Sequence, residues 1–159
     1  MGRRRKPEAP PRDFYLEGKD QLVCYLPGGE YERGGVLTGR MKEEDREFCS
    51  RIKKYAQDRG QEFGVYRPAK FKVGFKHKEV PNNWINRIYR FAEKQGYKKG
   101  LHLVGWSAGG SLASSQIVYY ENPVVRSLVI INGRVAEKPN HVHFNAAFYA
   151  DRIRPPTLL

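Results

Sequence analysis

The sequence predicts an α/β fold with a mainly parallel sheet of about five or six strands and helices on both faces. Apolar, strand-like runs alternate with amphipathic helical segments along the chain, and one such run leads directly into a glycine-rich turn and another helix. The chain has 159 residues, of which 40% are hydrophobic, so it can bury a core of its own. We therefore expect a single domain over residues 14–159.

Five segments have the composition of β-strands: residues 14–16, 21–26, 62–66, 101–104 and 127–131. The run over 21–26 is almost continuously apolar, which is typical of a strand that is buried on both faces of a sheet. The run over 127–131 is the most strongly β-branched in the chain and predicts another interior strand. Because helical segments separate these runs, we expect right-handed crossovers between parallel strands.

Two helices are predicted before the glycine-rich turn. The first begins near Met41 or Lys42 and ends at Gly60, and acidic residues in its first turn suit the helix dipole. Its expected core-facing stripe consists of Phe48, Ile52, Tyr55 and Ala56. The second helix follows Pro81 and ends near Gly96. Glycines keep residues 28–40 irregular in this prediction, and residues 68–78 form a basic, aromatic loop.

The chain is strongly basic, with 29 lysines and arginines against 17 acidic residues and a net charge of +12. Residues 1–13 are rich in proline and basic side chains, so we expect a disordered tail there. Residues 51–99 contain fourteen basic and four acidic side chains, the largest local excess of positive charge in the chain. This charge favours contact with a polyanion such as RNA, although solvated basic faces explain it equally well.

Composition also bears on cofactors and location. Cys24 and Cys49 are too few for a disulfide framework, and we expect both to be reduced and packed. The histidines lack the clustered partners of a zinc site, so we expect no metal and no other cofactor. No run approaches the roughly 18 apolar residues of a membrane span, and the N-terminus lacks the apolar stretch of a secretory signal. We therefore expect a cytoplasmic protein.

The glycine-rich turn fits the pattern G-x-S-x-G, with Ser107 at its centre: Gly105-Trp106-Ser107-Ala108-Gly109. This turn forces the serine into a strained backbone conformation and projects its hydroxyl above the sheet edge. Small flanking residues are needed because neighbouring backbone segments approach closely. Five residues alone are a weak signal, but the apolar strand before them and the small-residue helix after them supply the required context.

The segment Leu101-His-Leu-Val-Gly-Trp-Ser-Ala-Gly-Gly-Ser-Leu-Ala113 resembles the nucleophile elbow of α/β-hydrolases, especially of their esterase, lipase and dienelactone-hydrolase-like branches. Val23-Cys-Tyr-Leu-Pro-Gly-Gly29 resembles the strand and loop that read His-Gly-Gly in this family, with Pro27 where histidine is frequent. Arg154-Pro-Pro-Thr-Leu-Leu159 resembles the start of the strand before the catalytic acid. The resemblance covers residues 21–159.

The resemblance implies a serine hydrolase that acts on carboxylic esters through an acyl-enzyme and needs no cofactor. Ser107 would be the nucleophile, and the backbone N–H of Ala108 would be one oxyanion donor. The second donor would come from the early loop, where Gly29 is the first choice and Glu30 the next. Such donors hold the negative oxygen of the tetrahedral intermediate.

The catalytic base is harder to assign from the sequence. The family order of serine, acid and histidine puts both partners of Ser107 beyond Leu159, so we expect a hydrolase core that lacks its final strands. Alternatively, His141 or His143 serves as the base, with Asp151 or Glu137 as the residue that orients it. A truncated chain and recruited substitutes are two interpretations that the sequence leaves open.

A third interpretation is a non-catalytic, hydrolase-like module. It would bind RNA or a ribonucleoprotein through the basic tail and residues 51–99. Aromatic and cationic residues alternate over 71–78, so rings there could stack on bases while lysines meet phosphates. If the final strands are missing, a parallel sheet that ends at Leu159 leaves an apolar edge strand, and we expect a dimer or another partner chain to contact that edge.

Overall fold

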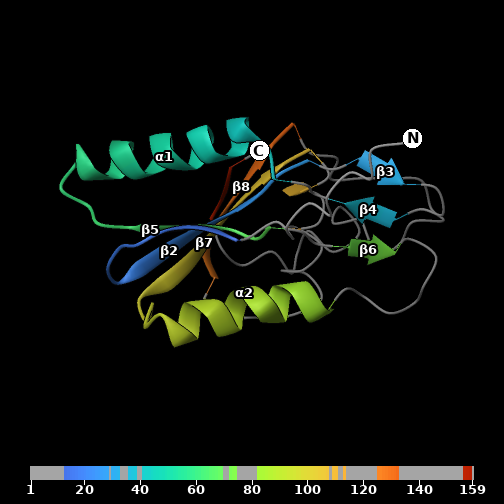
Figure 1. The fold of residues 1–159 in the computed structure, drawn as a ribbon. Helices are drawn as coiled ribbons and strands as arrows, with labels where there is room; N and C mark the ends of the chain where they lie inside the picture. Colours follow the sequence, from blue (N-terminus) through green and yellow to red (C-terminus); the bar gives the residue numbers. More distant parts are fainter. Residues whose placement is uncertain are drawn as a thin grey trace, which may run out of the picture.

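The computed structural model describes residues 13–28, 30–32, 36–38, 41–69, 72–74, 82–107, 109–110, 113, 125–132 and 156–158. Within these ranges, a six-stranded sheet lies between helix α1 (Glu43–Gln57) and helix α2 (Asn82–Lys94) (Figure 1). The sheet order is β1-β5-β2-β7-β8-β9. The strands are β1 (Phe14–Leu16), β2 (Gln21–Leu26), β5 (Gly64–Arg67), β7 (Gly100–Trp106), β8 (Val125–Ile131) and β9 (Thr157–Leu158).

All neighbouring strands of this sheet are parallel except β1, which pairs antiparallel with β5. The predicted α/β class with a mainly parallel sheet is therefore confirmed. The strand expected over 62–66 begins later, at Gly64, while β8 begins earlier than expected, at Val125. Strand β9 lies at one edge of the described sheet, as the sequence indicated, and the partner chain expected along that edge stays a prediction.

Strand β2 runs through the middle of the sheet and is buried on both faces. Leu22, Cys24 and Leu26 belong to the apolar cluster that also contains Ile88 and Ala92 of α2. Alternate residues of the strand point the other way, where Val23 and Tyr25 form a second cluster with Cys49, Phe48 and Ile52 of α1. The near-continuous apolar pattern therefore arises because helices cover both faces of this strand. Both cysteines are buried and free, as expected.

Helix α1 turns the predicted stripe to the core except at Tyr55: Phe48 and Ile52 pack against the core and Ala56 is buried. Its buried residues are Asp45, Cys49 and Ala56, whereas Tyr55 is 62% exposed and lies under the guanidinium of Arg59. The prediction for Tyr55 was wrong because the inward stripe passes through Cys49, so a side chain one position before Ala56 turns towards solvent.

Among the described residues, no helix is long and apolar enough to cross a membrane.

A second, antiparallel sheet was missed in the sequence. It contains β3 (Glu30–Glu32), β4 (Val36–Thr38) and β6 (Lys72–Gly74), on the right in Figure 1. The prediction of irregular chain over 28–40 and of an uninterrupted loop over 68–78 was therefore wrong. Strands of three residues are too short to produce a recognisable alternation, and the pairing of β4 with β6 joins segments far apart in the sequence.

Asp13 ties the antiparallel edge strand to the rest of the fold. Its carboxylate accepts hydrogen bonds from the Tyr66 hydroxyl at 2.7 Å, the Ala69 N–H at 2.8 Å and the Arg87 guanidinium at 2.5 Å. Burial raises the pKa of Asp13, but the three hydrogen bonds and the charge of Arg87 outweigh burial and lower it overall. The carboxylate therefore stays ionised and connects β1, β5 and α2.

Candidate active site

Ser107 occupies a sharp corner between β7 and a following helix. Its φ of 51° lies in the left-handed region, which is costly for a residue with a Cβ. The Ser107 N–H donates to the Ile131 carbonyl oxygen at 2.8 Å, and the Gly110 N–H donates to the Ser107 carbonyl oxygen at 2.9 Å. Gly109 and Gly110 are already helical. The predicted order of strand, strained corner and helix is thus confirmed over the described residues.

Three glycines allow the corner to close. A Cβ added at Gly109 would lie 2.0 Å from the Leu26 carbonyl oxygen, so the start of the helix rests against the end of β2. A Cβ at Gly105 would lie 2.4 Å from the Cα of Gly110, where the chain folds back on itself. A Cβ at Gly110 would meet the side chain of Ile130 at 2.7 Å. The small residues are therefore a steric requirement of the turn.

Gly109→Ala should lower the free energy of unfolding by about 3 kcal/mol, because a backbone carbonyl cannot move aside as a side chain can. Urea denaturation followed by circular dichroism measures the change. Gly60→Ala is the matched control: its φ is +69° but nothing lies within 4 Å of the added Cβ. The control bears the cost of a left-handed alanine, about 1 kcal/mol, which the helical Gly109 does not bear, and it involves no steric contact. Equal losses in the two variants would contradict the packing argument.

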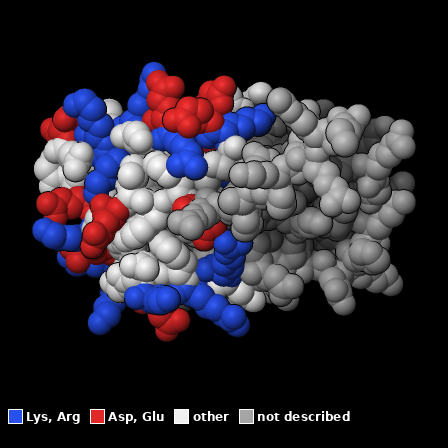
Figure 2. All heavy atoms as spheres, in the orientation of Figure 1, with Lys and Arg blue, Asp and Glu red and all other residues white. Residues whose placement is uncertain are grey.

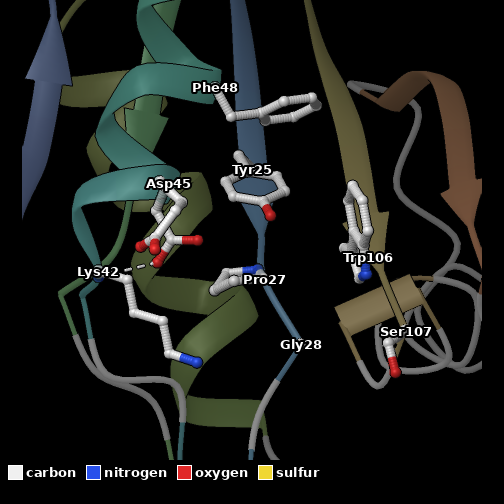
Figure 3. A pocket seen from close by; sticks show the side chains of 9 residues that line it. Tyr25, Pro27, Gly28, Lys42, Asp45, Phe48, Trp106 and Ser107 are labelled. Carbon is white, nitrogen blue, oxygen red and sulfur yellow. Dashed lines mark hydrogen bonds between the residues drawn. The ribbon is translucent and has the colours of Figure 1, made fainter.

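A pocket of about 440 Å³ opens beside Ser107 (Figure 3). Three elements converge on it: the end of β2 with its following loop, the first turns of α1, and the end of β7. The lining residues are Tyr25, Pro27, Gly28, Lys42, Glu44, Asp45, Phe48, Trp106 and Ser107. A Cβ added at Gly28 would lie 3.3 Å from the Cβ of Ser107, so the loop after β2 passes next to the serine.

The pocket has an aromatic wall near Ser107. The rings of Tyr25 and Phe48 have centroids 4.7 Å apart, and Phe48 meets Trp106 edge-on, with centroids 6.5 Å apart and an interplanar angle of 90°. Trp106 remains 43% exposed. Burial, together with the nearby charge of Asp45, raises the pKa of Tyr25 to about 12. Tyr25 is therefore a neutral phenol at physiological pH.

Asp45, at the end of the pocket away from Ser107, forms a buried ion pair with Arg67. The Asp45 carboxylate lies 2.8 Å from Nη2 of Arg67 and also accepts the Lys42 N–H at 3.1 Å. Arg67 is completely buried and donates to the carbonyl oxygens of Pro68 and Ala69 as well. From the sequence, the acidic residues in the first turn of this helix were related only to the helix dipole, and Arg67 was missed. No local pattern indicates that the start of a helix and the end of a strand will meet.

Several predicted site residues lie outside the described ranges: Gly29, Ala108, Glu137, His141, His143 and Asp151. Their roles stay predictions. Of the tail predicted over residues 1–13, only Asp13 is described. His102, the histidine within the described ranges, is bound elsewhere: its Nδ1 lies 2.7 Å from the Ser127 hydroxyl and its Nε2 lies 2.7 Å from Gln21 Oε1. It precedes Ser107 by five residues of extended chain, about 16 Å, which is too far for a base.

The basic side chains over 51–99 that the structure describes are mostly engaged near the surface. Salt bridges join Arg51 to Glu47, Lys54 to Asp58 and Lys99 to Asp20. Lys53 instead donates to the backbone carbonyls of Glu17 and Phe63. Figure 2 shows basic and acidic side chains intermixed on the described part of the visible face. Contact of this region with RNA stays a prediction.

Neither a protein-family model nor a curated protein sequence matches the chain. Solved structures do match it. A candidate esterase from Staphylococcus aureus aligns with 97% of this chain and 62% of its own, with 15% identity and a TM-score of 0.59. An esterase from Pyrococcus furiosus aligns with 91% of this chain and 62% of its own, with 12% identity and a TM-score of 0.55. A monoacylglycerol lipase from Paleococcus ferrophilus aligns with 81% of this chain and 45% of its own, with 15% identity and a TM-score of 0.50. The chain thus spans less than two thirds of their length.

Proposed function

Because the chain has the α/β-hydrolase fold, we propose that it is a serine hydrolase that cleaves carboxylic esters through an acyl-enzyme on Ser107. One observation carries this proposal: Ser107 sits in a strained, left-handed corner and also lines a pocket of about 440 Å³. Strain of this kind persists where the surrounding structure enforces it, and it concentrates at active sites. The esterases and lipases among the similar structures support the same chemistry.

The proposed reaction has two stages. The Ser107 hydroxyl oxygen attacks the ester carbonyl carbon while a base takes the hydroxyl proton, and a tetrahedral oxyanion forms. The bond to the alcohol oxygen then breaks, and the alcohol leaves with that proton. In the second stage, water gives a proton to the base and attacks the acyl-enzyme. The base then returns this proton to the Ser107 oxygen as the bond to the acyl carbon breaks, so that the carboxylic acid leaves and the serine hydroxyl is restored.

Two backbone N–H groups are assigned to the oxyanion, those of Ala108 and Gly29. The helical residues that follow the corner support the first assignment, because the free amides at a helix start favour negative charge. Gly28 supports the second, since it passes next to Ser107 and directly precedes Gly29. Loss of one such donor typically lowers turnover by about 10²- to 10³-fold.

We propose His143 or His141 as the base, with Asp151 or Glu137 as the residue that orients it, which is one of the interpretations that the sequence leaves open. His102 does not take this role, since both of its ring nitrogens are within hydrogen-bond distance of side chains distant from Ser107. Replacing each histidine separately with glutamine should abolish ester hydrolysis in one variant only. Full activity in both variants would remove the two residues from the mechanism.

Ester hydrolysis and covalent labelling test the proposal together. The chain should release para-nitrophenol from its acetate ester faster than the heat-denatured chain does, and an aryl organophosphonate should block this activity with one equivalent bound. Tandem mass spectrometry should place the label on Ser107 and not on its neighbours Ser111, Ser114 or Ser115. A label on another serine, or no release above the denatured control, would contradict the assignment.

A further inference from the structure

We infer that the pocket beside Ser107 is the acyl-binding site and takes one aromatic ring or a short alkyl chain, with Trp106 and Phe48 as the residues that set this preference. The inference rests on the proposed function, because it assigns the group that becomes attached to Ser107. It goes further in naming the substrate class: esters of small aryl or short-chain carboxylic acids, as opposed to esters of long fatty acids.

The aromatic side chains beside Ser107 are suited to a flat, apolar group. Trp106 directly precedes the serine, and its ring lies across the pocket from Tyr25 and Pro27 (Figure 3). Phe48 joins the two walls through its ring contacts with Tyr25 and with Trp106. Aromatic pairs favour offset or edge-to-face arrangements, and the partly exposed Trp106 offers a bound ring such a contact.

The far end of the pocket limits the length of the acyl group. Lys42 and Asp45 line that end, away from Ser107 in Figure 3, and Glu44 also belongs to the pocket lining. An alkyl chain that reached them would remove water from charged groups and return no hydrogen bond, which is unfavourable. Arg67 holds Asp45 in place, so this polar end cannot readily rearrange into an apolar channel.

The pocket volume agrees with the same limit. At about 440 Å³, it lies near the lower end of the 300–1,000 Å³ range of small-molecule sites. Water that hydrates the charged side chains occupies part of that volume. A phenyl ring or a few methylenes therefore fill the aromatic part, and a longer chain has to project into solvent.

A series of para-nitrophenyl esters tests the inference. We expect kcat/KM for the butyrate and benzoate esters to exceed that for the octanoate and dodecanoate esters by at least about tenfold. Trp106→Ala should reduce the preference for benzoate over octanoate by about tenfold, because the stacking wall is lost. Phe48→Trp should lower benzoate hydrolysis more than acetate hydrolysis, because a larger ring fills the pocket.

Tyr55→Ala is the matched control, since Tyr55 is an exposed aromatic residue on the same helix as Phe48 but outside the pocket lining. It should leave the order of preference unchanged. Equal rates for benzoate and octanoate esters, with no effect of Trp106→Ala, would overturn the acyl-pocket assignment and leave the hydrolase proposal standing.

A binding measurement tests the acyl-pocket assignment separately from the hydrolase proposal, because it does not depend on ester hydrolysis. Benzamide, an uncleaved analogue of a benzoate ester, is titrated into the Ser107→Ala variant while tryptophan fluorescence is recorded. We expect saturable quenching that is lost when Trp106→Phe is added, and at least about tenfold weaker binding of octanamide. Benzamide binding without ester hydrolysis by the parent chain would retain the pocket and overturn the hydrolase. Absence of quenching would overturn the pocket.

Discussion

Ser107→Ala is expected to lower kcat for para-nitrophenyl acetate by roughly 10⁴- to 10⁶-fold, the largest effect of any single substitution in this chain. Without the hydroxyl oxygen no acyl-enzyme can form, and the remaining rate comes from binding and oxyanion stabilisation alone. KM should change little, because alanine leaves the pocket walls in place. Stability should also change little, since both residues bear the same cost of a left-handed backbone.

Ser127→Ala is the matched control for this substitution. Ser127 is also partly buried and lies on β8, next to β7, but its hydroxyl lies 2.7 Å from His102 Nδ1. We expect the control to retain its rate within about twofold, because Ser127 lies outside the lining of the pocket beside Ser107. Equal losses from Ser107→Ala and Ser127→Ala, or retained turnover in Ser107→Ala, would refute Ser107 as the nucleophile.

Asp45→Ala is expected to lower the free energy of unfolding by about 3–5 kcal/mol, because it leaves the Arg67 guanidinium charged and buried without its carboxylate. Arg67 is 0% exposed and Asp45 7% exposed, so water cannot easily replace the lost partner. Chemical denaturation with urea measures the loss. The pocket should respond as well, because Asp45 lines it and also accepts the Lys42 N–H at the start of α1.

The double variant Asp45→Leu with Arg67→Met provides the diagnostic comparison. Replacing a whole buried pair with apolar residues is often neutral or stabilising, so most of the lost stability should return. Asp58→Ala breaks the exposed pair with Lys54 on the same helix and should cost less than about 1 kcal/mol. A loss below about 1 kcal/mol for Asp45→Ala would show that the buried pair does not hold α1 against β5.

Features that depend on patterns local in the sequence were predicted correctly, and features that depend on packing between distant segments were not. The alternation of apolar strands and amphipathic helices predicted the sheet, because burial on two faces imposes an apolar run such as 21–26. Tyr55 was misplaced because a stripe of aromatic and aliphatic residues on α1 can be drawn in two ways, and only packing decides between them. The three-residue strands of the second sheet have no period to detect.

The sequence by itself determined the strained corner at Ser107, because G-x-S-x-G between a strand and a helix leaves few other conformations for the chain. Only the tertiary structure decided what surrounds that serine. The pairing of Asp45 with Arg67, the aromatic wall of Tyr25, Phe48 and Trp106, and the close approach of Gly28 all join residues distant in the chain. Such contacts depend on how sheet and helix pack together, and local sequence patterns do not encode them.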